Sequence, residues 1–138
     1  MSYLLDTSTI CEVTKKTPNA GVIEWLSEID DRFLFMSVLS LGEIGRGIEC
    51  LPASRKRDRL KHWLEHDLTE WFEERVLPID RNVCELWGRM LSRKDRTMPA
   101  IDSLLAATAN YHRLTIVTRN AKDFDYPEID VMNPWSPE

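Results

Sequence analysis

Four carboxylates occupy positions from which a protein of alternating strands and helices could do chemistry. Asp6 directly ends the short apolar run at residues 3–5, and Glu43 lies in the opening turns of the helix expected after a second apolar run. Asp102 lies in the first turn of a later helix, and Asp123 follows the run LTIVT by a few residues. Because ligands of open α/β sheets bind outside the carboxyl ends of the strands, these acids are expected to gather at one edge.

Carboxylates that gather at one end of a sheet repel one another unless their pKa values rise or a cation lies between them. Oxygen ligands without His or Cys suit Mg²⁺ or Mn²⁺. A carboxylate-held Mg²⁺ that keeps some of its waters is an arrangement used to cut or transfer phosphodiesters. The four acids therefore predict a metal site with phosphodiester chemistry.

Each acid taken alone also has an ordinary structural explanation. Asp6, or the hydroxyl residues after it, could cap the next helix, and Glu43 could pair with Arg46 about one turn along. Asp102 suits a helix N-terminus because of the helix dipole, and Asp123 could close a turn. These explanations do not account for acids after three successive strand-like segments, so both interpretations stay open on spacing alone.

The elements that must position the acids are short strands alternating with helices. Strands are expected at residues 2–6, 33–37, 76–79 and 114–118 and near 129–132. Three of them are apolar without period-two alternation, which is typical of parallel strands covered on both faces, and the fold class is therefore α/β. Helices are expected over residues 8–13, from 18 onwards, after Ser37, over 53–75, from Asp80 and from Pro99.

Composition and charge narrow the class of protein. No repeat or linker divides residues 1–138, which are expected to form a single domain. The net charge of −5 argues against indiscriminate binding to nucleic acid but does not exclude a nucleic-acid enzyme. No stretch approaches the ~20 apolar residues of a membrane span, and no signal-peptide pattern is present, so a cytoplasmic protein is expected. The cysteines are expected to be reduced, buried thiols: Cys11, Cys50 and Cys84.

Four blocks of the sequence, in order, are YLLDTSTICE, SVLSLGEIGRGI, PAIDSLLAATA and IVTRNAKDF. This set resembles the PIN-domain nucleases, specifically the VapC toxins of type II toxin–antitoxin pairs, with the FitB-like branch nearest. The resemblance implies a three-layer α/β/α sandwich on a mostly parallel sheet of four or five strands. It also implies a homodimer that hydrolyses RNA with Mg²⁺ or Mn²⁺, and a small VapB-like antitoxin that inhibits it and binds operator DNA.

The resemblance also assigns roles to individual residues. The family's metal-binding acids fall on Asp6, Glu43, Asp102 and Asp123. Of these, the three aspartates would mainly ligate the metal directly or through water, while Glu43 would hold a water or act as a base. Thr118 would orient the groups around the metal. Ser8 stands where similar sequences often have Asn, and its hydroxyl is expected to donate a hydrogen bond to Asp6 or to a water.

Basic residues supply candidates for binding RNA. Arg46, Arg119 and Lys122 lie nearest the acids in sequence and are expected to steer the RNA. The run RKRDRLK at residues 55–61 could contact phosphate or the antitoxin, or could form an ordinary solvated helix face, and the pattern does not decide between these.

Two further patterns favour structural interpretations. His62 and His66 are one helical turn apart, but they fall on the polar side of their helix and are expected to be solvated rather than to bind zinc. Four tryptophans fit apolar helix stripes and are expected to pack in the core: Trp25, Trp63, Trp71 and Trp87. The alternative function is a catalytically weak PIN-like subunit that acts mainly in a DNA-binding repressor complex with its antitoxin.

Overall fold

A five-stranded sheet forms the centre of the molecule in the computed structural model, which describes residues 1–136. The strands lie in the order β3-β2-β1-β4-β5, and every neighbouring pair is parallel. The strands are β1 (Tyr3–Leu5), β2 (Leu34–Ser37), β3 (Val76–Leu77), β4 (Thr115–Val117) and β5 (Val131–Met132). The predicted α/β class and the five predicted strands are confirmed, although each strand is shorter than its sequence pattern.

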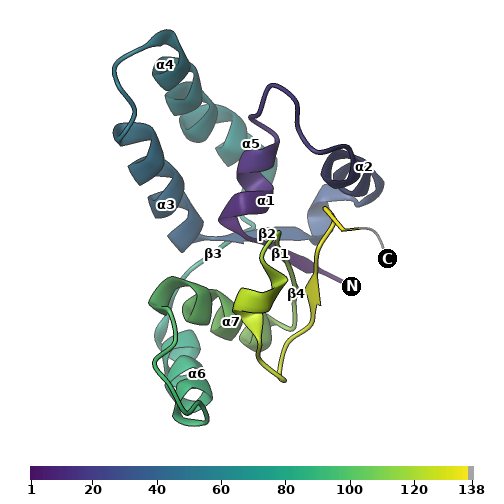
Figure 1. The fold of residues 1–138 in the computed structure, drawn as a ribbon, viewed down its shortest axis with the longest axis vertical. Coiled ribbons are helices and arrows are strands. Elements are labelled where there is room, and N and C mark those ends of the chain that lie inside the picture. Colours follow the sequence, from purple (N-terminus) through teal and green to yellow (C-terminus); the bar gives the residue numbers. More distant parts are fainter. Residues whose placement is uncertain (137–138) are drawn as a thin grey trace.

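Helices cover both faces of the sheet and produce three layers (Figure 1). One face carries α1 (Thr7–Glu12), α2 (Ala20–Glu28), α3 (Val38–Glu49), α4 (Arg55–His62) and α5 (Leu68–Phe72). The other face carries α6 (Arg81–Ser92) and α7 (Ala100–His112). Short 3-10 turns complete the path, η1 (Asp31–Phe33) before β2 and η3 (Ala121–Phe124) after β4.

The long amphipathic helix predicted over residues 53–75 forms between Arg55 and Phe72. It is not a single α-helix, because a π-helical stretch, η2 (Trp63–Asp67), separates α4 from α5. A π-helical turn holds more residues than an α-turn, so the side chains of α4 and α5 do not share one unbroken stripe. His62 and His66 are exposed, as predicted, with their ring centroids 4.5 Å apart.

Two separate apolar cores lie on the two faces of the sheet. Successive strand residues point to opposite faces, so Leu4 packs in the core beneath α6 and α7 while Leu5 packs in the core beneath α1, α3 and α5. Both leucines are fully buried. The absence of alternation in these strands, which the sequence shows, therefore follows from burial on both faces.

The helix starts follow the capping residues that the sequence offers. The Asp6 side chain accepts a hydrogen bond from the Thr9 N–H. The helices expected after Ser37 and from Asp80 are present as α3 and α6, and these two side chains cap them. Pro99 precedes α7 at the N-cap position, one residue before the first helical residue. Asp6 is thus a helix cap, and its capping bond uses only one of its two carboxylate oxygens.

The prediction of buried thiols was wrong for two of the three cysteines. Cys50 and Cys84 are exposed and Cys11 is half-buried. Cys50 follows the last residue of α3 and so lies beyond its apolar stripe. Cys84 is adjacent to the buried Val83 on α6, and a step of one residue turns a helical side chain by about 100° away from the core.

The four helical tryptophans are only half-buried, at the edges of the cores rather than in their centres. The indole N–H of Trp87 donates to Ser103 Oγ at 2.8 Å, and that of Trp71 donates to Asp31 at 3.1 Å. Among residues 1–136, no helix combines the length and the apolar character that a membrane span requires.

Candidate active site

The carboxyl ends of β1 and β4 meet at the point where the strand order reverses. The chain runs outward from β1 to β2 and β3, then returns to the other side of β1 to form β4 and β5. Such a reversal leaves a crevice at the strand ends, which is the usual ligand site of open α/β sheets. Leu5 pairs with Val117 in register, so the next residues, Asp6 and Thr118, lie at this crevice.

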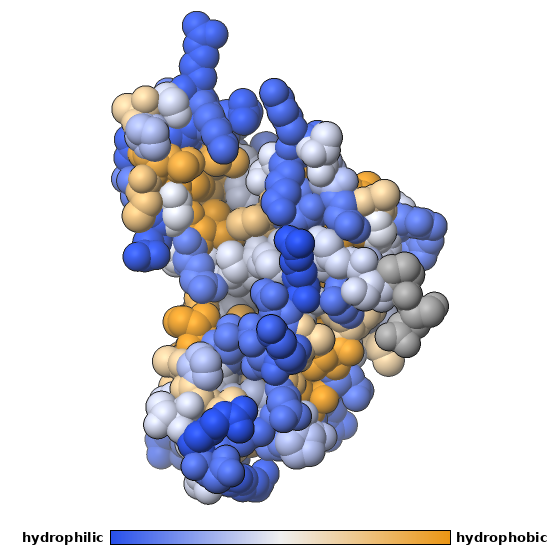
Figure 2. All heavy atoms as spheres, in the orientation of Figure 1, coloured by the Kyte–Doolittle hydropathy of each residue, from blue (hydrophilic) through white to orange (hydrophobic). Residues whose placement is uncertain are grey.

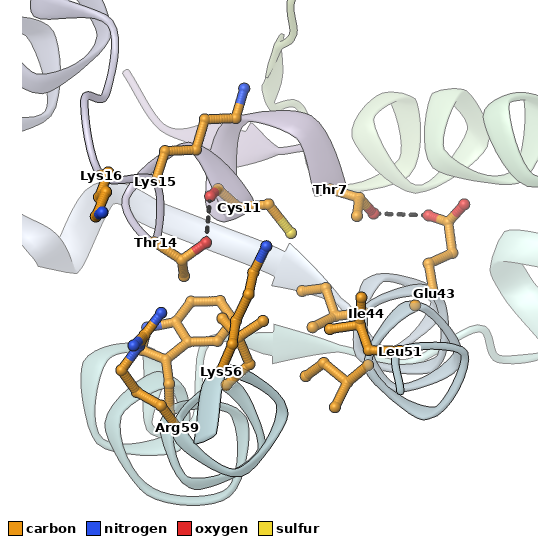
Figure 3. A pocket seen from close by; sticks show the side chains of 14 residues that line it. Thr7, Cys11, Thr14, Lys15, Lys16, Glu43, Ile44, Leu51, Lys56 and Arg59 are labelled. Atoms are coloured by element: carbon orange, nitrogen blue, oxygen red, sulfur yellow. Dashed lines mark hydrogen bonds between the residues drawn. The ribbon is translucent and has the colours of Figure 1, made fainter. Parts of the chain in front are cut away.

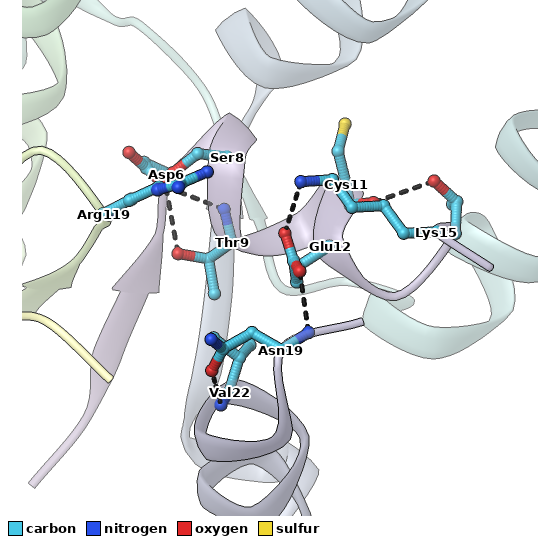
Figure 4. Close-up of polar contacts among 10 residues, drawn as sticks. Asp6, Ser8, Thr9, Cys11, Glu12, Lys15, Asn19, Val22 and Arg119 are labelled. Atoms are coloured by element: carbon cyan, nitrogen blue, oxygen red, sulfur yellow. Dashed lines mark hydrogen bonds and ion pairs between the residues drawn. The ribbon is translucent and has the colours of Figure 1, made fainter. Parts of the chain in front are cut away.

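The Asp6 carboxylate is buried, with 7 % of its surface exposed, and is surrounded by hydroxyl groups (Figure 4). Ser8 Oγ donates to Oδ1 at 2.7 Å, and the Thr9 backbone N–H donates to the same oxygen at 3.0 Å. The Thr118 hydroxyl donates to Oδ2. A buried carboxylate is costly unless donors satisfy it, and these three residues supply them.

The hydroxyl groups around Asp6 are themselves held in place. Thr118 Oγ1 accepts the backbone N–H of Asn120 at 3.0 Å, which leaves its own proton for Asp6. Thr9 Oγ1 lies 2.8 Å from the Val117 carbonyl oxygen and 3.0 Å from Asp6 Oδ1. The predicted hydrogen bond from Ser8 to Asp6 is present. Serine is therefore able to fix the orientation of the carboxylate at this position.

Glu43 is exposed on α3 and is held from the neighbouring helix α1. Thr7 Oγ1 donates to Glu43 Oε1 at 2.6 Å and lies 3.0 Å from Ser40 Oγ. This contact ties the helix after β1 to the helix after β2. It places the Glu43 carboxylate beside the crevice that holds Asp6.

The charges of the other three acids affect the pKa of Asp102. Partial burial, followed by the negative charges of Asp123, Glu43 and Asp6, raises the pKa of its carboxyl above the usual value. Charges act in this way only when the groups lie close together. The structure therefore brings the four sequence-predicted acids into one electrostatic neighbourhood, with Asp102 on α7 and the exposed Asp123 on η3.

The donor set suits a hard divalent cation. All four groups offer carboxylate oxygen, which Mg²⁺ and Mn²⁺ prefer, and no ion pair within residues 1–136 neutralises any of them. As the side chains stand, no three acidic, His or Cys groups of the described residues form a closed ligand cluster. The assignment of metal ligands therefore stays a prediction.

Cys11 places a thiol beside the acids. Burial, and then the charges of Asp6 and Glu43, raise the pKa of the Cys11 thiol to about 11. The thiol is therefore protonated at neutral pH. Because the thiolate is the nucleophilic form, the geometry does not favour a cysteine nucleophile.

The predicted RNA-steering residues lie on the surface around the site. Arg119 directly follows Thr118, its backbone N–H points to Ser8 Oγ at 3.5 Å, and its guanidinium lies 5.9 Å from the ring centre of Trp135. Arg46 and Lys122 are exposed on α3 and η3. Their contact with RNA stays a prediction.

Three residues of the site were not predicted as members of it: Thr7, Thr9 and Ser40. Thr9 and Ser40 are fully buried, although hydroxyl residues are usually exposed. The signal available in the sequence was the density of hydroxyl residues directly after Asp6, in the segment DTST. That density predicted caps, but it did not indicate which hydroxyl would reach Glu43 on another helix.

Glu12 fixes the path between α1 and α2. It is buried, it pairs with Lys15 at 2.9 Å, and it accepts the Asn19 backbone N–H at 2.8 Å (Figure 4). The hydrogen bond from Lys15 is the main reason that the pKa of Glu12 lies below its usual value. These contacts hold the loop after α1, and hence α1 itself, in place beside the acids.

Replacing Thr118 by Val tests the hydrogen bond to Asp6 without changing the shape of the residue. The substitution leaves one oxygen of a buried carboxylate without its donor, so we expect a loss of about 1–3 kcal/mol in the free energy of unfolding. Urea denaturation in metal-free buffer measures it. Thr115→Val, at the start of the strand β4 that Thr118 follows, is the control. Equal losses in the two variants would contradict a special role for the Thr118 hydroxyl.

Replacing Asp102 by Asn should stabilise the metal-free protein. A carboxyl whose folded pKa is raised destabilises the fold at neutral pH, and this penalty disappears as the pH falls through that pKa. At pH 7 we therefore expect the free energy of unfolding of Asp102→Asn to exceed that of wild type by about 1 kcal/mol or less. The variant should accordingly melt at a higher temperature. The difference should shrink toward acidic pH, and a gain that is independent of pH would contradict the charge-repulsion explanation.

Comparison with known proteins adds independent information. The PIN domain model matches residues 3–128. The chain is 31 % identical over 135 residues to "Toxin FitB" of Neisseria gonorrhoeae, covering 96 % of this chain and 97 % of that protein. It is 28 % identical over 137 residues to "VapC ribonuclease Y4jK" of Sinorhizobium fredii, covering 97 % and 98 %. A chain in the solved structure of FitAB bound to an IR36 DNA fragment superposes with a TM-score of 0.90 at 29 % identity, over 99 % of this chain and 97 % of that one.

Proposed function

The chain belongs to the PIN-domain family, and from that premise we propose that it is the toxin of a type II toxin–antitoxin pair, a metal-dependent endoribonuclease. The observation that carries the proposal is the gathering of four carboxylates at the strand-order reversal, where each of the other three raises the pKa of Asp102. The similarity to a VapC ribonuclease over nearly the whole chain supports RNA as the substrate. Residues 1–138 would constitute a single domain of this kind.

The metal would be Mg²⁺ or Mn²⁺, held mainly by Asp6, Asp102 and Asp123. Such a cation lowers the pKa of an attacking water and neutralises charge that develops on the phosphate oxygens. Its positive charge would also relieve the repulsion that raises the pKa of Asp102. The oxygen-only chemistry of these side chains suits either ion.

The chain's own residues position the reacting groups. Thr118, Ser8 and Thr9 hold the Asp6 carboxylate in one orientation, so that it need not reorganise when phosphate binds. Thr7 fixes Glu43, whose second oxygen is left to hold a water or accept its proton during in-line attack on phosphorus. Thr118 thus acts through Asp6, and Arg119, Arg46 and Lys122 would attract the RNA backbone.

The expected partners are a second copy of the chain and a small VapB-like antitoxin that inhibits cleavage. Operator DNA would be bound only through the antitoxin. The similarity to a chain in the FitAB–DNA complex supports this assembly. The alternative function, a catalytically weak subunit of a repressor complex, would need the same assembly but no metal.

RNA cleavage by the purified protein tests the proposal directly. We expect cleavage of single-stranded RNA with Mg²⁺ or Mn²⁺ and none with EDTA, leaving 5′-phosphate ends that sequencing identifies. Asp6→Asn and Asp102→Asn should lower kcat/KM by about 100-fold or more, because each removes charge that the transition state needs. Asp95 is an exposed acid outside the site, and Asp95→Asn is the control. Equal activity in all variants would contradict the assignment of Asp6 and Asp102 to the active site.

Thermal melting separates the enzyme from the binding-only subunit. A metal that binds only the folded state stabilises it by about 2.7 kcal/mol at 100 times its dissociation constant. We expect Mg²⁺ or Mn²⁺ to raise the melting temperature of wild type but not of Asp102→Asn, which should melt higher only in the absence of metal. An unchanged wild-type melting temperature would favour the repressor subunit.

A further inference from the structure

A groove of about 940 Å³ lies between α1, α3 and the helix formed by α4 and η2, and we call it the α3–α4 groove. Its floor is apolar and its rim is basic. The floor is formed by Ile44, Ile48, Leu51, Leu60 and Trp63. The rim carries Lys15, Lys16, Lys56 and Arg59. Figure 2 shows this apolar surface over α3 and α4, bordered by long hydrophilic side chains.

One end of the α3–α4 groove opens onto the acids. Thr7 and Glu43 line the groove, and the hydrogen bond between them lies away from Lys16 and Arg59 at the other end (Figure 3). Glu43 is also one of the charges that raise the pKa of Asp102. An extended polymer with one phosphate at the acids could therefore continue along the groove past Glu43.

Four of the five Lys and Arg residues of α4 form two pairs with different surroundings. Arg57 and Lys61 pair with Glu49, at 2.8 Å and 3.4 Å, and neither lines the groove. Lys56 and Arg59 line the groove and take part in no ion pair within residues 1–136. Lys16, on the opposite wall, is likewise outside the ion pairs of these residues. Arg55 is exposed, outside these ion pairs and outside the groove. Two of the three α4 cations without an ion pair among residues 1–136 therefore line the groove.

An RNA must approach four carboxylates on a protein whose net charge is −5. Such an approach needs local positive charge, because phosphate binding depends on Lys and Arg near the backbone. An apolar floor with an aromatic residue suits an unstacked base, whereas the bases of a duplex stay stacked on one another. Both requirements are met in the same groove.

We infer that the α3–α4 groove binds the single-stranded RNA segment adjacent to the cleaved phosphate, with Lys16, Lys56 and Arg59 on its phosphates and Trp63 beneath a base. This inference rests on the proposed ribonuclease activity and adds the track of the substrate. It also gives roles to four cations of the basic run at residues 55–61: Lys56 and Arg59 would face the RNA, while Arg57 and Lys61 pair with Glu49 of α3.

The double variant Lys56→Gln/Arg59→Gln tests the track, with Arg55→Gln/Lys61→Gln as the control of equal charge on the same helix. Binding of a fluorescein-labelled, ten-nucleotide single-stranded RNA is measured by anisotropy in the Asp102→Asn background, which prevents cleavage, and KM is measured in the active protein. We expect the groove variant to weaken binding and raise KM about tenfold with kcat within about twofold. The plot of the logarithm of the binding constant against the logarithm of the salt concentration should become less steep. Its slope should change by about 1.4, which is about 0.7 for each of the two phosphates that the variant no longer neutralises.

Trp63→Leu tests the base contact separately. Removing the stacking partner of a base should weaken binding by about tenfold without changing the salt dependence. Trp63 also packs against the apolar core, so the melting temperature of the Trp63→Leu variant is measured in parallel. The groove double variant alters only exposed side chains, and its result therefore does not depend on a change in folding.

The outcomes distinguish this inference from the proposed function. If wild type cleaves RNA but the groove variant retains KM and salt dependence, the inference is overturned and the nuclease stands. The inference is also overturned if the groove variant binds RNA as wild type does but loses affinity for an acidic protein segment. That segment would then be the occupant of the groove. If wild type does not cleave, the proposed function fails, and anisotropy still decides whether the groove binds RNA.

Discussion

The buried Asp6 carboxylate is the constraint on which the rest of the site depends. Its position is fixed by the pairing of β1 with β4, which brings the Thr118 hydroxyl of one strand end to the carboxylate of the other. A charge with so little exposure is tolerable only with several donors, and Ser8 and Thr9 supply the others from the first turn of α1. The hydrogen bonds that stabilise the fold here also preorganise the group that is proposed to bind metal.

Stability and function oppose one another at Asp102. Burial and three neighbouring acids raise its pKa, so in the absence of a cation the ionised form weakens the fold. A protein selected for stability alone would replace such a residue. Its presence is understandable if a divalent cation neutralises the cluster. Metal binding would then relieve the repulsion among the acids, and this relief would add to the affinity for metal.

Acidic and basic side chains are concentrated on two adjacent surfaces of the protein. The acids gather at the strand-order reversal, while uncompensated cations border the adjacent α3–α4 groove. Arg57 and Lys61 face Glu49 instead. The overall charge of −5 therefore says little about where a polyanion could bind, because opposite local fields coexist on neighbouring surfaces.

The sequence by itself determined the alternation of strands and helices, the position of Asp6 at a strand end, the bond from Ser8 and membership of the PIN-domain family, all of which are confirmed. These depend on local periodicity, capping and motif order. Only the tertiary structure decided that Thr7 reaches Glu43 and which cations of α4 line the groove. Each of these depends on the rotation of one helix against another, and packing across the sheet sets that rotation rather than the residues of the helix itself.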